Sequence, residues 1–461
     1  MDAQRTIRDA NADPSHAVMS TNPHEAPVPL THRSATELAR LIRDRNVSAR
    51  EVMEEHLAAI ERRNPTLNAI VAIADDALDS ADARDRALAR GEPIGPLHGV
   101  PFTAKDIIEA AGLPTTLGMI ELADSRPDHD ATVVARMRAA GAILLGKTNC
   151  PPGGSGGVTQ NDLHGRTLNP YDERRSPGGS SGGEAAAIAA GLSPCGIGSD
   201  SGGSLRVPAH FCGIATLKPT AGRIPITGVL DDRGQLGSMR DPRTQAGPMA
   251  RRADDLGTLL SILAGPDGSD AGCVPAPLGD PSAVDLHGVR VMLYRSDGVA
   301  PPDAETDGAL VMAAAVLRER GAIVAEGAPP PGGHDLTERV WDSYGDEMTA
   351  PQVYDVLQDW DAFRTTMLAV LERFDLILSP VAPEPAPRHG GDVVWRYTTP
   401  HSLTGWPCVV VRAGTSAGMP VGVQLVSGPW QEDVAIAAAV AIERTLGGWQ
   451  PPGEPAVSVD R

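Results

Sequence analysis

Cysteine is scarce in this sequence, and its arrangement excludes two common uses of the residue. The 461 residues include five cysteines, and no two of them form a Cys-x-x-Cys pair. A sparse, odd set of this kind argues against a disulfide framework and for a reducing compartment. The chain also lacks a His-Glu-x-x-His motif and any Cys/His cluster, so it offers no metal ligands by pattern. We predict no metal and no cofactor.

Long apolar runs and basic runs are missing as well. The longest apolar runs, 309–317 and 434–442, are far shorter than the roughly 20 residues of a spanning helix. The first 30 residues are polar and have no signal-peptide core. The formal net charge is −19, from 40 Lys+Arg against 59 Asp+Glu, without a polybasic stretch. Nucleic acid and anionic membrane are therefore poor candidate partners, and we expect a cytoplasmic protein.

Glycine and serine, in contrast, are concentrated in one stretch, Ser176–Ala209. It contains two glycine-flanked serine sites, Ser180-Ser181 and Ser204, joined by an alanine-rich segment from Glu184 to Gly191. Glycine has no Cβ, so it allows sharp bends and close approach of the backbone to a ligand. The pattern predicts two loops that flank one short helix and present serine oxygens and backbone N–H groups.

The rest of the chain alternates between helical and strand patterns. Residues 1–30 have no periodicity and predict a mobile tail. Ser34-x-x-Glu37 and Ser48-x-x-Glu51 are capping-box patterns that begin two helices, the second of which we expect to end at Asn64-Pro65. Strands are predicted at 101–105, 143–146, 289–294, 322–325, 376–378, 408–411 and 421–426, and helices at 131–140, 305–320, 360–373 and 432–446. This alternation indicates an α/β protein whose sheet is covered by helices on both faces.

The sequence also contains a lysine that could act as the base for these serines. A serine hydroxyl is a poor nucleophile until another group takes its proton. Only one histidine, His210, is near either serine loop in the sequence, six residues after Ser204. Lys105, at the end of a predicted strand, could serve instead, because Ser–Lys arrangements are an accepted variant of the catalytic triad.

Eight segments of the chain match the motifs of one known family, in that family's order. They are 99–106 (GVPFTAKD), 140–149 (AGAILLGKTN), 169–172 (NPYD), 176–183 (SPGGSSGG), 198–206 (GSDSGGSLR), 211–220 (FCGIATLKPT), 247–251 (GPMAR) and 420–425 (PVGVQL). Through these segments the chain resembles the amidase signature family. The similarity extends from about residue 34 to the strand that ends near residue 425.

The resemblance implies a Ser–cis-Ser–Lys triad on a single α/β/α sandwich over residues 31–461, with a large mixed central sheet. Ser204 takes the position of the nucleophile, Ser180 that of the bridging serine after a cis peptide, and Lys105 that of the base. The backbone N–H groups of Ser201, Gly202, Gly203 and Ser204 take the position of the oxyanion hole. The implied activity is hydrolysis of linear C–N bonds through an acyl-enzyme, without a cofactor, on a small molecule, by a monomer or homodimer.

Charged and hydroxyl neighbours of the triad have simpler interpretations. We expect Asp200 and Arg206 to tie the nucleophile loop to the scaffold, and Ser181 to form hydrogen bonds without reacting. Asp106 follows the lysine and either orients it or is a solvated loop carboxylate.

Three segments depart from the family pattern. After Asn149 the residues are small, and Gly154, Ser155 and Gly156 occupy the segment that lines the acyl pocket in relatives. This composition suggests a roomy site for a bulky or aryl group, as an amide or a carbamate (urethane). His164 stands where an aromatic residue is common. The polar segment Gly228–Gly247 could cover the site as a lid.

Two other sequence patterns would indicate different functions. Gly141-x-x-x-x-Gly146-Lys147-Thr148 matches a nucleotide-binding P-loop, but the predicted strand lies between its glycines rather than before them. Gly178–Gly182 and Gly153–Gly157 both match the Gly-x-Ser-x-Gly elbow of α/β-hydrolases. An esterase of that type would use Ser180 as nucleophile with His389 or His401 downstream.

A further alternative keeps the same triad. In the glutaminase subunit of a tRNA-dependent amidotransferase, it would supply ammonia from glutamine to a partner protein. No partner surface is evident in the sequence, so we place this alternative second.

Overall fold

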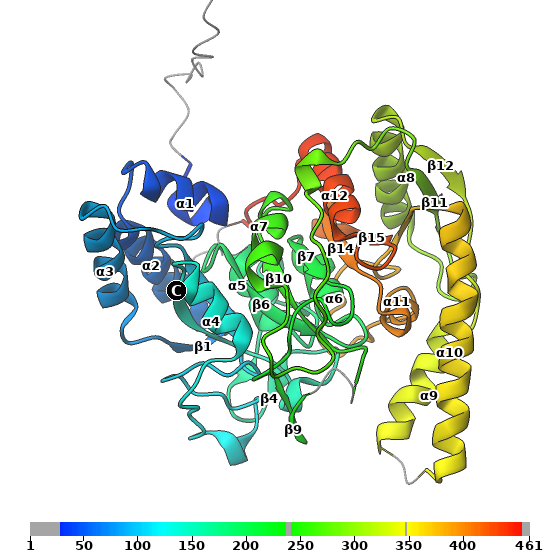
Figure 1. The fold of residues 1–461 in the computed structure, drawn as a ribbon, viewed down its shortest axis with the longest axis horizontal. Coiled ribbons are helices and arrows are strands. Elements are labelled where there is room, and N and C mark those ends of the chain that lie inside the picture. Colours follow the sequence, from blue (N-terminus) through cyan, green and yellow to red (C-terminus); the bar gives the residue numbers. More distant parts are fainter. Residues whose placement is uncertain (1–27, 237–240, 346–347, 454–461) are drawn as a thin grey trace, which may run out of the picture.

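The computed structural model describes residues 28–236, 241–345 and 348–453. The predicted tail, 1–30, lies outside these residues except for its last three positions. Within the described residues, eleven strands form one mixed sheet in the order β1-β3-β2-β6-β10-β7-β14-β15-β13-β11-β12 (Figure 1). This arrangement, with helices on both faces, confirms the α/β class and the large mixed sheet.

The elements have the following bounds. The strands are β1 (Ile70–Ile73), β2 (Pro101–Lys105), β3 (Ile143–Thr148), β4 (Gln160–Asn161), β5 (Gly165–Arg166), β6 (Cys195–Asp200), β7 (Ala215–Lys218), β8 (Leu230–Asp231), β9 (Gly234–Gln235), β10 (Gln245–Ala250), β11 (Arg290–Leu293), β12 (Ile323–Glu326), β13 (Leu376–Pro380), β14 (Cys408–Ser416) and β15 (Met419–Ser427). The helices are α1 (Ala35–Arg43), α2 (Ala49–Leu67), α3 (Ala77–Ala89), α4 (Thr132–Ala139), α5 (Gly182–Ala189), α6 (Arg206–Cys212), α7 (Asp254–Leu263), α8 (Ala304–Glu319), α9 (Gly333–Gly345), α10 (Ala350–Arg373), α11 (Thr399–Thr404) and α12 (Glu432–Leu446). Short 3-10 turns are η1 (Leu30–His32), η2 (Ile120–Leu122), η3 (Pro152–Gly154) and η4 (Pro281–Ala283).

The two faces of the sheet differ in chemistry, because successive side chains of a strand point to opposite faces. On one face, Phe102 and Ala104 of β2 and Leu217 of β7 join the large apolar cluster. Helices α4, α7, α8 and α12 contact the sheet there. The intervening positions include Lys105 and Lys218, so the opposite face carries polar groups beneath α5 and α6.

The ends of the sheet are covered by different helices. Helices α1, α2 and α3 lie near the β1 end, and α9 and α10 lie near the β11 end (Figure 1). At the β11 end, Trp360, Phe363 and Met367 of α10 pack with Ile377 and Met292 from the sheet in one buried cluster. No helix among the described residues is long and apolar enough to cross a membrane.

Local signals at the first helices are confirmed, with one exception. Ser34 and Ser48 both cap their helices, and Ser48 and Glu51 form a complete capping box. The prediction that Asn64-Pro65 ends the second helix is wrong, because α2 continues to Leu67 with Pro65 in its last turn. The Asn64 side chain instead accepts hydrogen bonds from the N–H groups of Ala69 and Ile70, at 2.9 Å each, and so secures the exit into β1.

The P-loop lookalike is a strand, as the sequence context predicts. Residues Ile143–Thr148 form β3, and a short 3-10 turn, not an α-helix, follows Lys147-Thr148. Lys147 is fully buried and donates hydrogen bonds to the Ile108 carbonyl at 2.5 Å and the Thr115 hydroxyl at 3.0 Å. Its amine is therefore committed to protein acceptors.

Candidate active site

Three chain segments meet at one edge of the sheet. Strands β2 and β6 are parallel neighbours, so their carboxyl ends, Lys105 and Asp200, lie at the same edge. The loop that holds Ser180 leads into α5, and the loop that holds Ser204 joins β6 to α6. The short α5 that lies between the two serine loops is the helix the sequence predicts, and all eight of its residues are buried.

The Lys105 amine is buried and faces two hydroxyls. Its Nζ lies 2.5 Å from Ser180 Oγ and 2.9 Å from Ser199 Oγ. The side chain is fully buried, and this burial lowers the pKa of Lys105 to about 8. No carboxylate forms an ion pair with it in the described part of the chain. The amine can therefore lose its proton at moderate pH, as a base must.

The bridging serine lies in a crowded loop. The Gly179–Ser180 peptide is cis, as the resemblance implies. A Cβ on Gly179 would lie 2.6 Å from the Gly156 carbonyl oxygen, so this position has room only for glycine. Ser181 joins the two serine loops: its N–H donates to the Ser204 carbonyl at 3.2 Å, and its hydroxyl donates to the Ser199 carbonyl at 3.1 Å.

The nucleophile loop leaves several backbone donors available. Within the described residues, the N–H groups of Ser201, Gly202, Gly203 and Ser204 donate no hydrogen bond to another protein group. Ser204 is half-buried and lines a cavity of about 510 Å³. Free N–H groups beside a hydroxyl in a cavity are the arrangement that stabilises a developing oxyanion.

A buried ion pair holds this loop in place. Asp200 and Arg206, both fully buried, form two parallel contacts of 3.0 and 2.9 Å. The Leu205 N–H also donates to Asp200 at 3.1 Å. Arg206 reaches the Thr398 carbonyl, the Ser402 hydroxyl and the Gln424 amide oxygen at 2.7, 2.7 and 2.9 Å. Both charges thus connect the loop to the scaffold, which is the structural role expected for them.

The cavity brings together segments far apart in the sequence. The small residues Gly153–Gly157, including the predicted lining residues Gly154, Ser155 and Gly156, form part of its wall with Ser204. The expected lid, Gly228–Gly247, contributes residues 230–233, Leu236, Asp241, Arg243 and Thr244, while residues 237–240 of it lie outside the described residues. The remaining wall includes Ile107, Trp341 and Trp395.

Two tryptophans lie directly on the glycines of the nucleophile loop. A Cβ on Gly202 would lie 2.4 Å from the Trp341 ring, and one on Gly203 would lie 2.9 Å from the Trp395 ring. Glycine therefore permits this close approach of the rings to the backbone. Sequence reasoning did not identify Trp341, Trp395 or Ser199, because only the tertiary fold brings them to Ser204 and Lys105.

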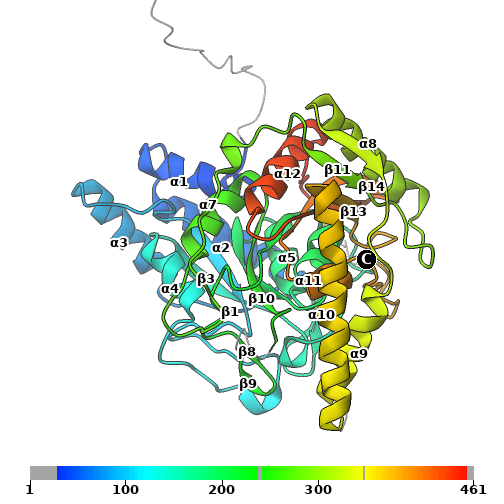
Figure 2. The ribbon, with the colours of Figure 1, turned by 45° about the vertical axis from the view of Figure 1, so that its right-hand side comes forward.

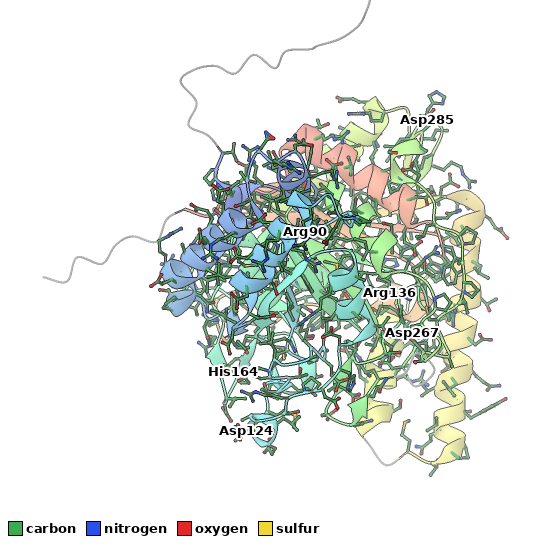
Figure 3. All side chains as sticks on the ribbon, turned by 60° about the vertical axis from the view of Figure 1, so that its left-hand side comes forward. Arg90, Asp124, Arg136, His164, Asp267 and Asp285 are labelled. Carbon is green, nitrogen blue, oxygen red and sulfur yellow. The ribbon has the colours of Figure 1, made fainter. Side chains whose placement is uncertain are left out.

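Several other sequence predictions change with the structure. Asp106 is neither solvated nor paired with Lys105: it is buried, accepts a hydrogen bond from the Thr116 hydroxyl, and lies 3.5 Å from the Lys147 amine. His164 forms a hydrogen bond with the Thr116 hydroxyl at 3.2 Å and does not line the cavity; it lies in the lower part of the molecule in Figure 3.

The alternative prediction of an α/β-hydrolase elbow at Ser180 is wrong. No strand leads into this serine, since the described residues 167–179 form turns and isolated bridges. Its hydroxyl contacts Lys105 rather than a histidine. His389 contacts the Glu173 carbonyl. The pKa of buried His401 is lowered to about 3 by desolvation, and its ring nitrogens have no hydrogen-bond partner within the described residues.

Other cavities and clusters do not compete with this site. A larger surface cavity, of about 710 Å³, lies between α7, η4 and α12, and none of the candidate catalytic residues lines it. No group of three or more His, Cys, Asp or Glu able to hold a metal occurs in the part of the chain described.

Comparisons with known proteins agree with the motifs. Residues 51–341 and 347–435 match the family model described as Amidase. The chain is 34% identical to the acylamidase of Rhodococcus erythropolis, over 89% of this chain and 94% of the relative. It is 32% identical to a glutamyl-tRNA(Gln) amidotransferase subunit of Chloroflexus aurantiacus, over 90% and 97%. A bacterial aryl acylamidase of the amidase signature enzymes superposes with a TM-score of 0.84 at 28% identity, covering 93% of this chain and all of that one.

The buried ion pair gives a stability prediction. Arg206→Met should lower the free energy of unfolding by about 3–5 kcal/mol, because it leaves Asp200 buried without its cation. The matched control is Arg290→Met, since Arg290 pairs with Asp375 at 2.6 Å in a position about 40% exposed. That variant should cost at most about 1 kcal/mol. Urea titrations of both variants measure the difference, and equal losses would contradict a special role for the buried pair.

Proposed function

The chain belongs to the amidase signature family and is an amidohydrolase; from this premise we propose that Ser204 is its nucleophile, Ser180 its bridging serine and Lys105 its base. The observation that carries the proposal is the 2.5 Å contact between the buried Lys105 amine and Ser180. Ser204 lines the cavity at the same edge of the sheet. Activation of a serine by a desolvated lysine is an established form of nucleophilic catalysis.

The acylation step follows from these positions. Ser204 Oγ attacks the carbonyl carbon while its proton passes to Ser180, whose own proton passes to neutral Lys105. The carbonyl oxygen becomes an oxyanion and accepts hydrogen bonds from N–H groups of residues 201–204, which have no protein acceptor among the described residues. One such donor contributes about 2.7–4 kcal/mol of transition-state stabilisation. The proton then returns through Ser180 to the leaving nitrogen, and the C–N bond breaks.

Deacylation uses the same proton relay, with water as the nucleophile and Ser204 as the leaving group. Water attacks the acyl-Ser204 carbonyl and gives its proton to Ser180, which passes one to Lys105. Collapse of the second oxyanion breaks the ester bond, and the proton returns to Ser204. Each cycle consumes one amide and one water and releases an acid and an amine.

The cavity favours a bulky or aromatic substrate, as an amide or an aryl carbamate. Its volume of about 510 Å³ exceeds what the smallest aliphatic amides fill, and Trp341 and Trp395 provide aromatic surfaces next to the nucleophile loop. Residues 230–233, at the β8 end of the hairpin, also line the cavity, which supports a lid formed by this segment. Stacking of an aryl group on such rings adds about 0.5–1.5 kcal/mol beyond burial.

The glutaminase subunit of a tRNA-dependent amidotransferase is the second candidate. It has support from the similarity to the Chloroflexus amidotransferase protein over most of both chains. The same three residues would act on glutamine, whose side chain is small and polar. The aromatic wall gives no evident advantage for that substrate, so the independent amidase is preferred.

The test of the proposal is a comparison of substrates. We expect wild type to release p-nitroaniline from 4-nitroacetanilide or from an ethyl N-(4-nitrophenyl)carbamate, and Ser204→Ala to be at least about 10³-fold slower. Trp341→Ala should weaken hydrolysis of the aryl substrates more than that of acetamide.

Ser261→Ala, an exposed serine on α7, is the matched control and should retain wild-type rates. Ammonia release from glutamine alone would instead favour the amidotransferase function. Undiminished activity of Ser204→Ala would show that another residue is the nucleophile.

The pKa of Lys105 gives a pH dependence. Since only neutral Lys105 accepts a proton and its pKa is lowered to about 8, log kcat/KM should rise as pH increases below 8 and level off above it. About a tenth of the lysine is neutral at pH 7 on this basis. Circular dichroism at each pH shows whether the fold persists. A profile that is flat from pH 6 to 9, or falls as pH rises, would contradict Lys105 as the base.

A further inference from the structure

Helix α10 has a long outer side that no other element of the described residues covers. It is 24 residues long and runs along the edge of the molecule in Figure 1, and it crosses the front in Figure 2. Its inward positions are buried against the sheet and neighbouring helices; they are Val356, Trp360, Phe363, Met367 and Val370. These buried residues form one side of the helix, and the residues on its other side are exposed.

A stripe of exposed residues follows this helix beside its buried side. Val353, Leu357 and Leu368 are 38%, 52% and 52% exposed. Two exposed charged residues, Asp361 and Arg364, lie between them at spacings of four, four, three and four residues. Because the helix turns once every 3.6 residues, these five positions share one narrow face. Three apolar side chains and one charge of each sign are thus exposed along one face of the helix.

The stripe also borders a groove. A cavity of about 380 Å³ is lined by Asp361, Arg364 and Leu368 of α10, and on its other side by Pro429 and Trp430. In the described part of the chain, Asp361 and Arg364 take part in no ion pair. The surface therefore combines apolar side chains, a groove and one unpaired charge of each sign.

The order of four of these residues, Leu357, Asp361, Arg364 and Leu368, is complementary to itself. The midpoint between Leu357 and Leu368 and the midpoint between Asp361 and Arg364 fall at the same place on the helix. When a second α10 lies antiparallel across this point, each leucine faces the other leucine and each charge faces its opposite. A two-fold axis requires this kind of self-matching surface.

We propose that the protein forms a homodimer through antiparallel contact of the two α10 helices about this axis, with each helix seated along the other's groove. The paired contacts are Leu357 with Leu368 of the second copy and Asp361 with Arg364 of the second copy, each formed twice. A contact based on one helix pair is small, so we expect a dissociation constant in the micromolar range, on the order of 1–50 µM. The inference is independent of the catalytic assignment.

Charge swaps test the proposal directly. Sedimentation velocity of the full chain from 0.1 to 100 µM, in about 0.15 M salt, should show a monomer–dimer equilibrium for wild type. Asp361→Arg and Arg364→Asp should each raise the dissociation constant at least about tenfold, because each places two pairs of like charges across the axis. The double variant Asp361→Arg/Arg364→Asp restores opposite pairs and should return the constant to within about threefold of wild type.

The matched control is Asp355→Arg, which makes the same change of charge on an exposed position of α10 outside the stripe. It should leave the dissociation constant unchanged within about twofold. A wild-type protein that stays monomeric at 100 µM would overturn the proposal. A dimer that is insensitive to both single swaps, or that the double swap fails to restore, would show that the contact lies elsewhere.

Discussion

The site depends on one buried contact, that of the Lys105 amine with Ser180 at 2.5 Å. An exposed lysine would stay protonated at neutral pH and could not act as a base. Here the side chain is buried and has no carboxylate partner in the described residues, so desolvation favours its neutral form. Its position at the end of β2, under α5, therefore favours the neutral amine that the proposed role as base requires.

The surrounding fold supports that contact with apolar packing on both faces of the sheet. One face of the sheet is closed by apolar residues beneath α4, α7, α8 and α12, which stabilises the scaffold. The other face carries the charged and hydroxyl groups of the site. There the Asp200–Arg206 pair satisfies both charges with two mutual contacts and fixes the loop that presents Ser204. Glycines at 202 and 203 allow the two tryptophan rings to approach that loop.

Much of this could be predicted from the sequence because the signals are local. Strand periodicity located β2 and β3, serine capping located α1 and α2, and the glycine-flanked serines located the two loops around α5. The predictions that fail concern residues whose contacts come from other segments of the chain. Asp106 was expected in a solvated loop or beside Lys105, but its partners Thr116 and Lys147 come from neighbouring segments. Trp341 and Trp395 join the cavity only through long-range packing, for which no short motif exists.

We propose that acyl transfer proceeds through Ser204 rather than Ser180. Incubation with an excess of a serine-directed fluorophosphonate, followed by proteolysis and mass spectrometry, identifies the residue that reacts. We expect one adduct, on Ser204, which should be absent from Ser204→Ala. It should form faster as the pH rises toward about 8, the lowered pKa of Lys105. An adduct on Ser180, or labelling of the Ser204→Ala protein at the wild-type rate, would contradict it.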